Sequence, residues 1–158
     1  MRKKLLILPI LVFMFFASVA QAHFLGYDSV DNGEIRWDGS TVYSSQWNAA
    51  ISTWNGLDPI DILPDTWWTY QDLTVDDVNR SDVTWTGQYT NSVGSDEIDL
   101  NRYYLDNDTS AQQQNTATHE LGHSLGLAHS FSGNVMYYAQ TSQTALGSHD
   151  QSNYDYLW

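Results

Sequence analysis

The sequence predicts a single α+β domain, and two features lead to this prediction. Short β-favouring runs rich in aromatic residues and threonine gather between about residues 60 and 105. Stretches with helical spacing of apolar residues lie on either side of them. The resulting order of helix, strands, helix, loop and helix differs from the alternating strands and helices of a doubly wound fold.

The first 22 residues differ in character from the rest of the chain. A basic start at Arg2, Lys3 and Lys4 precedes an apolar run, which ends in the small-residue triplet Ala20-Gln21-Ala22. This layout is typical of a secretory signal peptide. An anchored transmembrane helix is the alternative, but the run is short for a bilayer and no charges follow it. We therefore expect cleavage after Ala22, a secreted extracellular protein, and one domain over residues 23–158.

The charge of the chain limits its expected partners, and the lack of cysteine limits the possible sources of its stability. Residues 23–158 keep all 19 acidic side chains but only three basic ones, namely Arg36, Arg80 and Arg102. Nucleic acids and anionic membranes reward lysine and arginine, so we expect neither as a partner. The chain contains no cysteine, so its stability must come from the core, from metals or from both. We expect a monomer.

The first elements are predicted within residues 33–57, which read as a short strand, a turn and a helix. Four apolar residues fall at helical spacing, Trp47, Ala50, Ile51 and Trp54. Ser44 or Ser45 is a suitable start, and Gly56 a suitable end, for this helix.

Three β-favouring runs then predict strands of one sheet: "TWWTYQDL" (66–73), "SDVTWTGQYT" (81–90) and "DEIDLNRYYL" (96–105). A second helix is expected to start at Asp108, Thr109 or Ser110 and to run through His123. A third helix is expected near the end of the chain, where Ser148 or Asp150 starts it and Tyr154, Leu157 and Trp158 share one face.

Three of the five histidines lie in the segment "THELGHSLGLAHS". His119 and His123 are four residues apart and so share one helix face, whereas Leu121 and Leu125 point to the opposite side. His129 reaches the same place only if the helix ends first, and Gly126 permits this because glycine adopts left-handed backbone conformations.

Three neutral imidazoles around Zn²⁺ leave one coordination position open, which is typical of a catalytic rather than a structural zinc site. The metal lowers the pKa of a bound water to about 7. Glu120, next to His119, is placed to take the proton of that water and to deliver it to the leaving amine. The chain is therefore predicted to be a zinc hydrolase, with His119, His123 and His129 as ligands and Glu120 as the catalytic base and acid.

The segment "HELGHSLGLAH" carries the five spaced residues of the metzincin signature, and the chain thus resembles the metzincin zinc endopeptidases. Met136, seven residues after His129, lies where metzincins have a methionine turn beneath the metal. Ser130 directly after the third histidine resembles the matrixin branch. The resemblance implies a zincin-type domain, with a twisted mixed sheet, three helices and an active-site cleft along an edge strand.

Three features depart from the matrixin pattern. Matrixins are usually held latent by a pro-segment whose cysteine caps the zinc; this chain has no cysteine, so we expect latency to arise otherwise or to be absent. The turn reads Met136-Tyr137-Tyr138, and a tyrosine two residues after the methionine resembles the astacin and serralysin branches. That resemblance implies that Tyr138 stabilises the oxyanion; a packed or exposed aromatic residue is the equal alternative. Only His23 and His149 are left for a second, structural zinc, so we do not expect one of the matrixin kind.

Acidic residues cluster around Asp72–Asp77, Asp96–Asp99 and Asp106–Asp108. Oxygen ligands suit Ca²⁺, and matrixin-like domains commonly hold structural calcium. None of the clusters has a defined calcium-loop spacing, so solvated acidic turns are the alternative for each.

The function predicted from these observations is a secreted zinc endopeptidase acting on protein or peptide substrates. The alternative is an exported metal-dependent binding or adhesion protein that keeps the metzincin scaffold without proteolysis. The intact Glu120 favours the enzyme, because a binding protein has no chemical need for that carboxylate.

Overall fold

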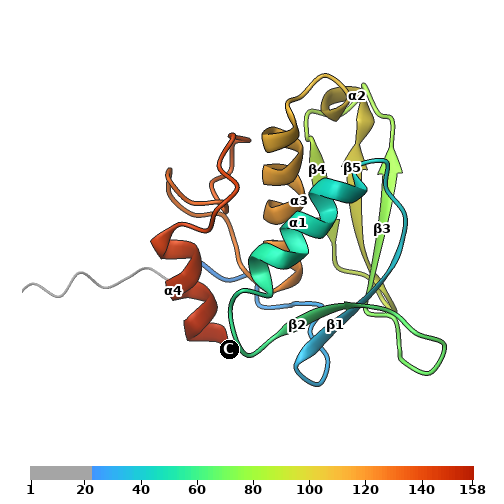
Figure 1. The fold of residues 1–158 in the computed structure, drawn as a ribbon, viewed down its shortest axis with the longest axis vertical. Coiled ribbons are helices and arrows are strands. Elements are labelled where there is room, and N and C mark those ends of the chain that lie inside the picture. The colour runs from blue at the N-terminus through green and yellow to red at the C-terminus, as the bar shows by residue number, and fades with distance from the viewer. Residues whose placement is uncertain (1–22) are drawn as a thin grey trace, which may run out of the picture.

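A computed structural model describes residues 23–158, and the expected signal peptide, residues 1–22, lies outside them. Five strands and four helices follow one another along the described chain (Figure 1). In order they are β1 (Glu34–Gly39), α1 (Ser44–Trp54), β2 (Asp61–Pro64), β3 (Leu73–Val78), β4 (Gly87–Thr90), β5 (Asp96–Asn101), α2 (Arg102–Leu105), α3 (Ser110–Ser124) and α4 (Ser148–Leu157). This is the predicted α+β class.

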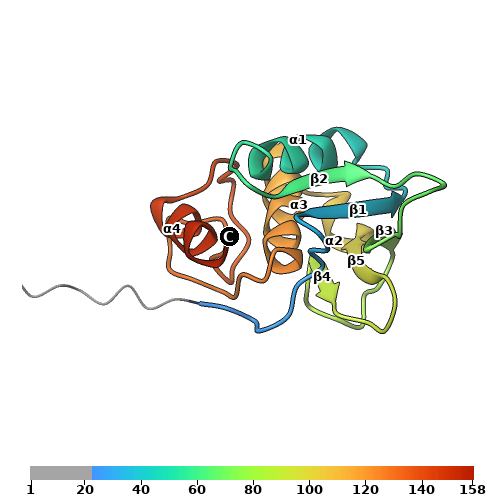
Figure 2. The same ribbon diagram turned by 90° about the horizontal axis from the view of Figure 1, so that it is seen from below.

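The five strands form one mixed sheet in the order β2-β1-β3-β5-β4. The first four strands of that order run parallel, with Ile35 opposite Ile62 and Val75 opposite Ile98. Only β4 runs antiparallel to its neighbour, pairing Tyr89 with Ile98 at the edge of the sheet. The edge strand β4 lies beside α3, the helix that carries the histidine motif (Figures 1 and 2).

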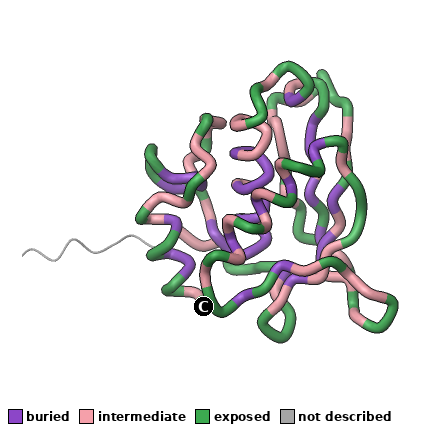
Figure 3. Tube along the Cα trace, in the orientation of Figure 1, coloured by how far each residue is buried: buried purple, intermediate pink, exposed green. Residues whose placement is uncertain are grey.

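Helices α1 and α3 pack against each other and cover one face of the sheet (Figure 2). The core between them is formed by Trp47 and Trp54 of α1, Leu121 of α3, and alternate strand residues such as Ile98 and Leu100. The buried positions concentrate along this interface (Figure 3). Because β5 alternates buried and more exposed residues, the sheet buries mainly one face.

Helix α1 confirms the predicted apolar face, with Trp47, Ala50 and Trp54 buried. The predicted serine cap is wrong. The residue before the helix is Tyr43, and Ser44 already lies in the first turn. Tyr43 instead buries its ring and donates its hydroxyl to Asp106 over 2.5 Å.

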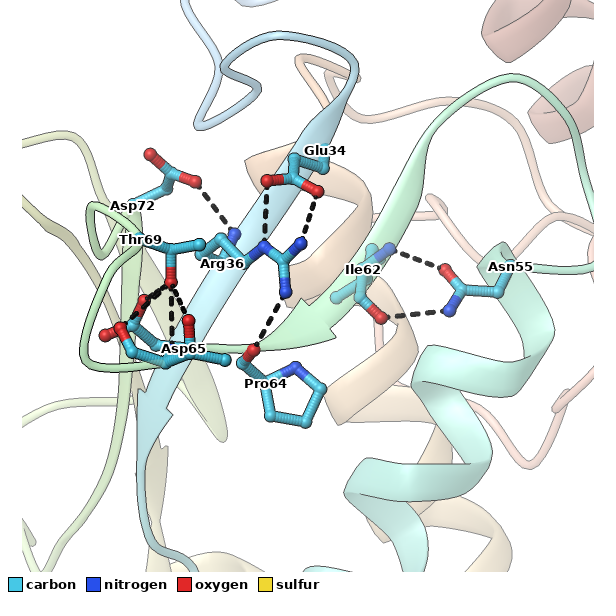
Figure 4. A network of polar contacts seen from close by, with 9 residues as sticks. Glu34, Arg36, Asn55, Ile62, Pro64, Asp65, Thr69 and Asp72 are labelled. Atoms are coloured by element: carbon cyan, nitrogen blue, oxygen red, sulfur yellow. Dashed lines mark hydrogen bonds and ion pairs between the residues drawn. The ribbon is translucent and has the colours of Figure 1, made fainter.

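Most of the run "TWWTYQDL" is not a strand: residues 66–72 belong to the loop between β2 and β3, and only Leu73 lies in β3. Trp67 and Trp68 are 86% and 70% exposed, so the aromatic content that predicted a strand belongs to a surface loop. Side-chain hydrogen bonds hold the loop in shape (Figure 4): the Thr69 hydroxyl donates to Asp65, and the backbone N–H of the β1 residue Arg36 donates to the Asp72 carboxylate. Local polar contacts override β-propensity here.

The end of the third run is also helical, since "RYYL" forms the short helix α2 directly after β5. The Asn101 side chain accepts from Tyr103 N and thereby starts this turn. The fold thus has four helices instead of the predicted three. Among the described residues, none of these helices has the length and apolar character needed to cross a membrane.

Candidate metal centre

Helix α3 positions the first two histidines. Thr109 caps it: its hydroxyl accepts from Gln112 N, while the Gln112 side chain accepts from Thr109 N, a reciprocal capping box. The sequence left three candidates for this start, and the structure selects Thr109. The buried face of the helix carries Leu121, and the opposite face directs His119 and His123 into a cleft.

The predicted turn that brings in the third histidine is present. Leu125 ends α3, and Gly126 follows with φ of +87°, in the left-handed region that glycine tolerates. Two backbone hydrogen bonds close the turn, from Gly126 N to His123 O and from Leu127 N to Gly122 O, at 2.9 and 3.0 Å. The chain reverses and delivers His129 beside the helix.

The three imidazoles converge. Their ring centroids are 4.7 Å apart for His119 and His123, and 5.1 and 5.0 Å from each of these to His129. One ligand nitrogen from each ring lies within 4.8 Å of the other two. Within residues 23–158 this is the one group of three or more metal-binding side chains that gathers so closely.

Hydrogen bonds to backbone carbonyls fix the orientation and the tautomer of two of these rings, those of His119 and His123. His119 Nδ1 lies 2.8 Å from Val135 O, and His123 Nδ1 lies 2.7 Å from Leu127 O. A carbonyl oxygen only accepts, so each Nδ1 carries the hydrogen and each Nε2 keeps its lone pair. Metal-binding histidines are commonly oriented in this way. The residues present therefore fit zinc: three neutral nitrogen donors, two of them with a fixed tautomer.

Burial also keeps these side chains neutral. Burial first, and neighbouring imidazoles second, lower the pKa of His119 to about 3 and that of His123 to about 4, although the hydrogen bonds to backbone carbonyls act in the opposite direction. The pKa of the more exposed His129 is lowered by burial as well. At neutral pH an ion entering the site thus meets free lone pairs and does not have to displace protons.

Glu120 lies in the wall of the same cleft, almost completely buried, against the edge strand. Burial raises the pKa of its carboxyl to about 8, and a hydrogen bond from the Tyr89 backbone acts in the opposite direction. Gly87 of β4 makes room for it: a Cβ there would lie 2.9 Å from Glu120 Oε1 and 2.7 Å from Thr116 Cγ2. A carboxyl with so perturbed a pKa in a cleft is typical of a functional residue.

Met136 lies beneath the histidines, as the resemblance implied. Its side chain is 1% exposed and packs against Gly122, which lies between His119 and His123 on α3. The buried carboxylate of Asp150, on α4, holds the same turn by accepting from Val135 N and Met136 N. Since Val135 O also accepts from His119, Asp150 positions a ligand through the backbone.

The cleft has a volume of about 460 Å³ and is lined by α3, by residues 84–89 on and before β4, and by residues 137–140. Tyr138 is among the lining residues and is 68% exposed. The structure thus places Tyr138 in the cleft with the three histidines and Glu120. All five residues predicted for the site lie together.

The predicted calcium sites gain no support. In the described part of the chain the acidic clusters do not converge into a ligand group, and several members are engaged by protein donors. Asp96 accepts from Ser29 and Tyr89, and Asp77 accepts from Thr41 and from Val42 N. These carboxylates serve as internal hydrogen-bond acceptors.

Sequence reasoning missed Gly87 and the anchoring role of Asp150. A glycine inside the β-favouring run "SDVTWTGQYT" was a usable signal, because strand glycines often mark a close approach. Asp150 was seen only as a helix start, and its contacts with Val135 and Met136 join segments that the sequence alone does not bring together.

Two solved structures are similar to the chain at low identity. One is the GM1-bound form of the ECX AB5 holotoxin (16% identity, TM-score 0.47, covering 77% of this chain and 61% of that one). The other is high choriolytic enzyme 1, a hatching-enzyme zinc protease from the medaka fish Oryzias latipes (19% identity, TM-score 0.44, covering 70% and 52%). The chain thus spans less than two thirds of the length of these proteins. No curated protein sequence matches it.

A family model assigns the chain. The model of peptidase family M43, described as pregnancy-associated plasma protein-A, matches residues 66–155, which is more than half of the chain and includes the histidine motif and Glu120. The chain therefore belongs to peptidase family M43, a family of metalloproteases.

Proposed function

We propose that this protein is a secreted zinc endopeptidase with Glu120 as its catalytic base and acid. The observation that carries the proposal is the convergence of three neutral imidazoles and one buried carboxyl in a single cleft. Membership of a metalloprotease family supports a protein or peptide substrate. The closer resemblance to matrixins, export after cleavage at Ala22 and the monomeric state remain predictions.

The edge strand offers a place for the substrate. Strand β4 pairs with β5 on one side only, and residues 84–89 line the cleft. An extended peptide can add to such an edge as a further strand, because its backbone groups then find partners along β4. This arrangement lays the peptide across the mouth of the cleft, above the histidines.

His119, His123 and His129 would hold the zinc ion through nitrogen. When bound, zinc supplies a Lewis acid that polarises the substrate carbonyl and acidifies a water molecule. Glu120 accepts a proton of the attacking water and passes it to the nitrogen of the leaving amine. The amine therefore leaves as a neutral molecule and not as an anion. Tyr138, which lines the same cleft, would donate its hydroxyl to the developing oxyanion.

The experiment is replacement of Glu120 by glutamine, which keeps the size of the side chain and removes its basicity. We expect proteolysis of casein to fall by roughly 10²- to 10⁴-fold while the zinc content stays that of the unchanged protein. Glu97→Gln is the matched control, because Glu97 is exposed on the neighbouring β5. Undiminished cleavage by Glu120→Gln would refute the assigned role.

The same assay separates the enzyme from a metal-dependent binding protein. Purified protein that binds zinc but leaves casein and gelatin intact would favour the binding protein. Loss of cleavage with phenanthroline, and its return with added zinc, is the result expected of the peptidase.

A further inference from the structure

A second pair of histidines lies outside the catalytic cleft. His23, at the start of the described chain, and His149, in the first turn of α4, have ring centroids 5.5 Å apart with the ring planes at 80°. The ring centroids of the three histidines in the candidate metal centre are 4.7 to 5.1 Å apart. The two rings are therefore spaced nearly as closely as rings that converge on one ion.

Each of these two rings carries a buried polar atom without a partner, as Trp37 Nε1, Trp47 Nε1 and Ser130 Oγ also do. Among residues 23–158, the buried side-chain nitrogens His23 Nε2 and His149 Nε2 have no hydrogen-bond partner. Leaving such an atom buried and unpaired is energetically unfavourable. In the candidate metal centre, by comparison, the Nδ1 atoms of His119 and His123 have backbone acceptors.

The surroundings of the pair are apolar on one side. The ring of Phe131 lies 5.2 Å from that of His23 and 5.1 Å from that of His149, so one phenyl group contacts both. Ser130, next to it in the chain, contributes a further buried hydroxyl without a partner. An aromatic ring beside the two buried nitrogen atoms limits the access of water to them.

We propose that His23 and His149 together bind a second divalent ion of the zinc, nickel and copper group through their Nε2 atoms. Imidazole is a preferred ligand of these metals, and an ion bridging the two rings satisfies both buried nitrogens at once. Cleavage after Ala22, where it occurs, adds the new amino group of His23 as a third nitrogen donor. Water completes the coordination.

The ion would tie together segments that frame the catalytic turn. His23 O accepts from Ala128 N, and Leu25 N donates to Gly126 O, so the amino-terminal segment pairs with the turn that delivers the third histidine ligand. His149 N donates to Asn134 Oδ1 at the start of α4. A metal joining these two segments acts as a clasp in a chain that contains no cysteine for a disulfide.

The first test measures the number of zinc ions bound to the protein as it is purified after expression of the full chain. After saturation with zinc and removal of the excess, we expect two zinc ions per chain by mass spectrometry and one in His149→Phe. The phenylalanine keeps an aromatic ring against Phe131 but offers no ligand. His123→Ala is the complementary control, which loses the catalytic ion and retains the second one. One ion in the unchanged chain, or an equal count in His149→Phe, overturns the proposal.

The second test does not depend on that variant folding. Cu²⁺ is added to the unchanged chain after zinc has filled the catalytic site, and its electron paramagnetic resonance spectrum is recorded. We expect hyperfine splitting from two or more nitrogen ligands, and loss of part of that splitting in His23→Phe. A spectrum that shows oxygen ligands only, or one that His23→Phe leaves unchanged, contradicts the proposed metal site at His23 and His149.

Discussion

Gly122 and Met136 fit against each other beneath the metal centre so tightly that the helix position has no room for a side chain. A Cβ on Gly122 would overlap the sulfur of Met136 and lie 3.0 Å from both Met136 Cε and Trp54 Cζ2. The glycine of the histidine motif that precedes His123 is thus required by the methionine turn, although the two are far apart in the chain.

The first prediction concerns this contact. Gly122→Ala should lower the free energy of unfolding by about 1–3 kcal/mol, because overpacking forces neighbouring groups apart. It should also weaken zinc binding, since the displaced turn carries Val135, the acceptor for His119. Urea denaturation and zinc competition with a chelator measure the two effects.

Met136→Ala supplies the control for this first prediction. Removing the methionine side chain opens the space, so Gly122→Ala should cost much less in that background, and a double-mutant cycle gives the coupling. Additive losses of stability would show that the two residues do not interact as described.

The second prediction concerns the room that Gly87 leaves for the catalytic carboxyl. A Cβ at Gly87 would lie 2.8 Å from Glu120 Cγ, so Gly87→Ala should push the carboxylate out of position. Misplacement on the order of 1 Å costs roughly 10²-fold in rate, and we expect kcat to fall to that extent with zinc content unchanged. Thr90→Ala, at an exposed position on the same strand, should leave kcat at its original value.

The third prediction tests Tyr138. If its hydroxyl stabilises the oxyanion, Tyr138→Phe should lower kcat by roughly 10- to 10²-fold with little change in KM, because the interaction forms in the transition state. Tyr70→Phe is the matched control, since Tyr70 is 70% exposed and Tyr138 is 68% exposed. Equal kcat values for the two variants would assign Tyr138 to the cleft wall alone.

The fourth prediction is the pH dependence of the metal-free protein. Burial raises the folded-state pKa of Glu120 from 4.5 to about 8, so between these values the folded protein binds a proton that the unfolded chain does not. Stability from this carboxyl is therefore present at low pH and is lost as the pH rises toward 8. Urea denaturation in a chelator at pH 6.5 and 8.0 should show the unchanged protein losing stability, relative to Glu120→Gln, as the pH rises.

His119 and His123 act in a different window. Their folded-state pKa values, about 3 and about 4, lie below the ordinary value of 6.5, so the unfolded chain binds more protons as the pH falls below 6.5. Stability from these imidazoles is thus lost on acidification. His123→Gln should reduce the loss of stability between pH 6.5 and 4.5; an undiminished loss would mean that other groups cause it.

The local pattern of the chain predicted the centre of the site because that geometry is local. Four-residue spacing on a helix determines that His119 and His123 share a face, and Gly126 permits the reversal that delivers His129. The core face of α1 and the capping of α3 near Thr109 follow from the same short-range rules. Each depends on residues within a few positions of one another.

Other features depended on which segments meet, and short-range patterns do not contain that information. The loop with Trp67 and Trp68 has the composition of a strand, yet hydrogen bonds such as that from Thr69 to Asp65 hold it as a surface loop. Gly87 approaches Glu120 only because β4 lies at the sheet edge beside α3. His23 and His149, whose ring centroids lie 5.5 Å apart, come from opposite ends of the described chain.

By itself the sequence determined the α+β class and the convergence of the three predicted imidazole ligands with the carboxyl beside them, since helix periodicity and turn chemistry act over a few residues. Only the tertiary structure decided which residues from distant segments pack against that site and hold it in position. Packing of Met136 on Gly122 and the anchoring of the turn by Asp150 arise from contacts between distant segments, whose free energy is gained only once the whole chain is folded.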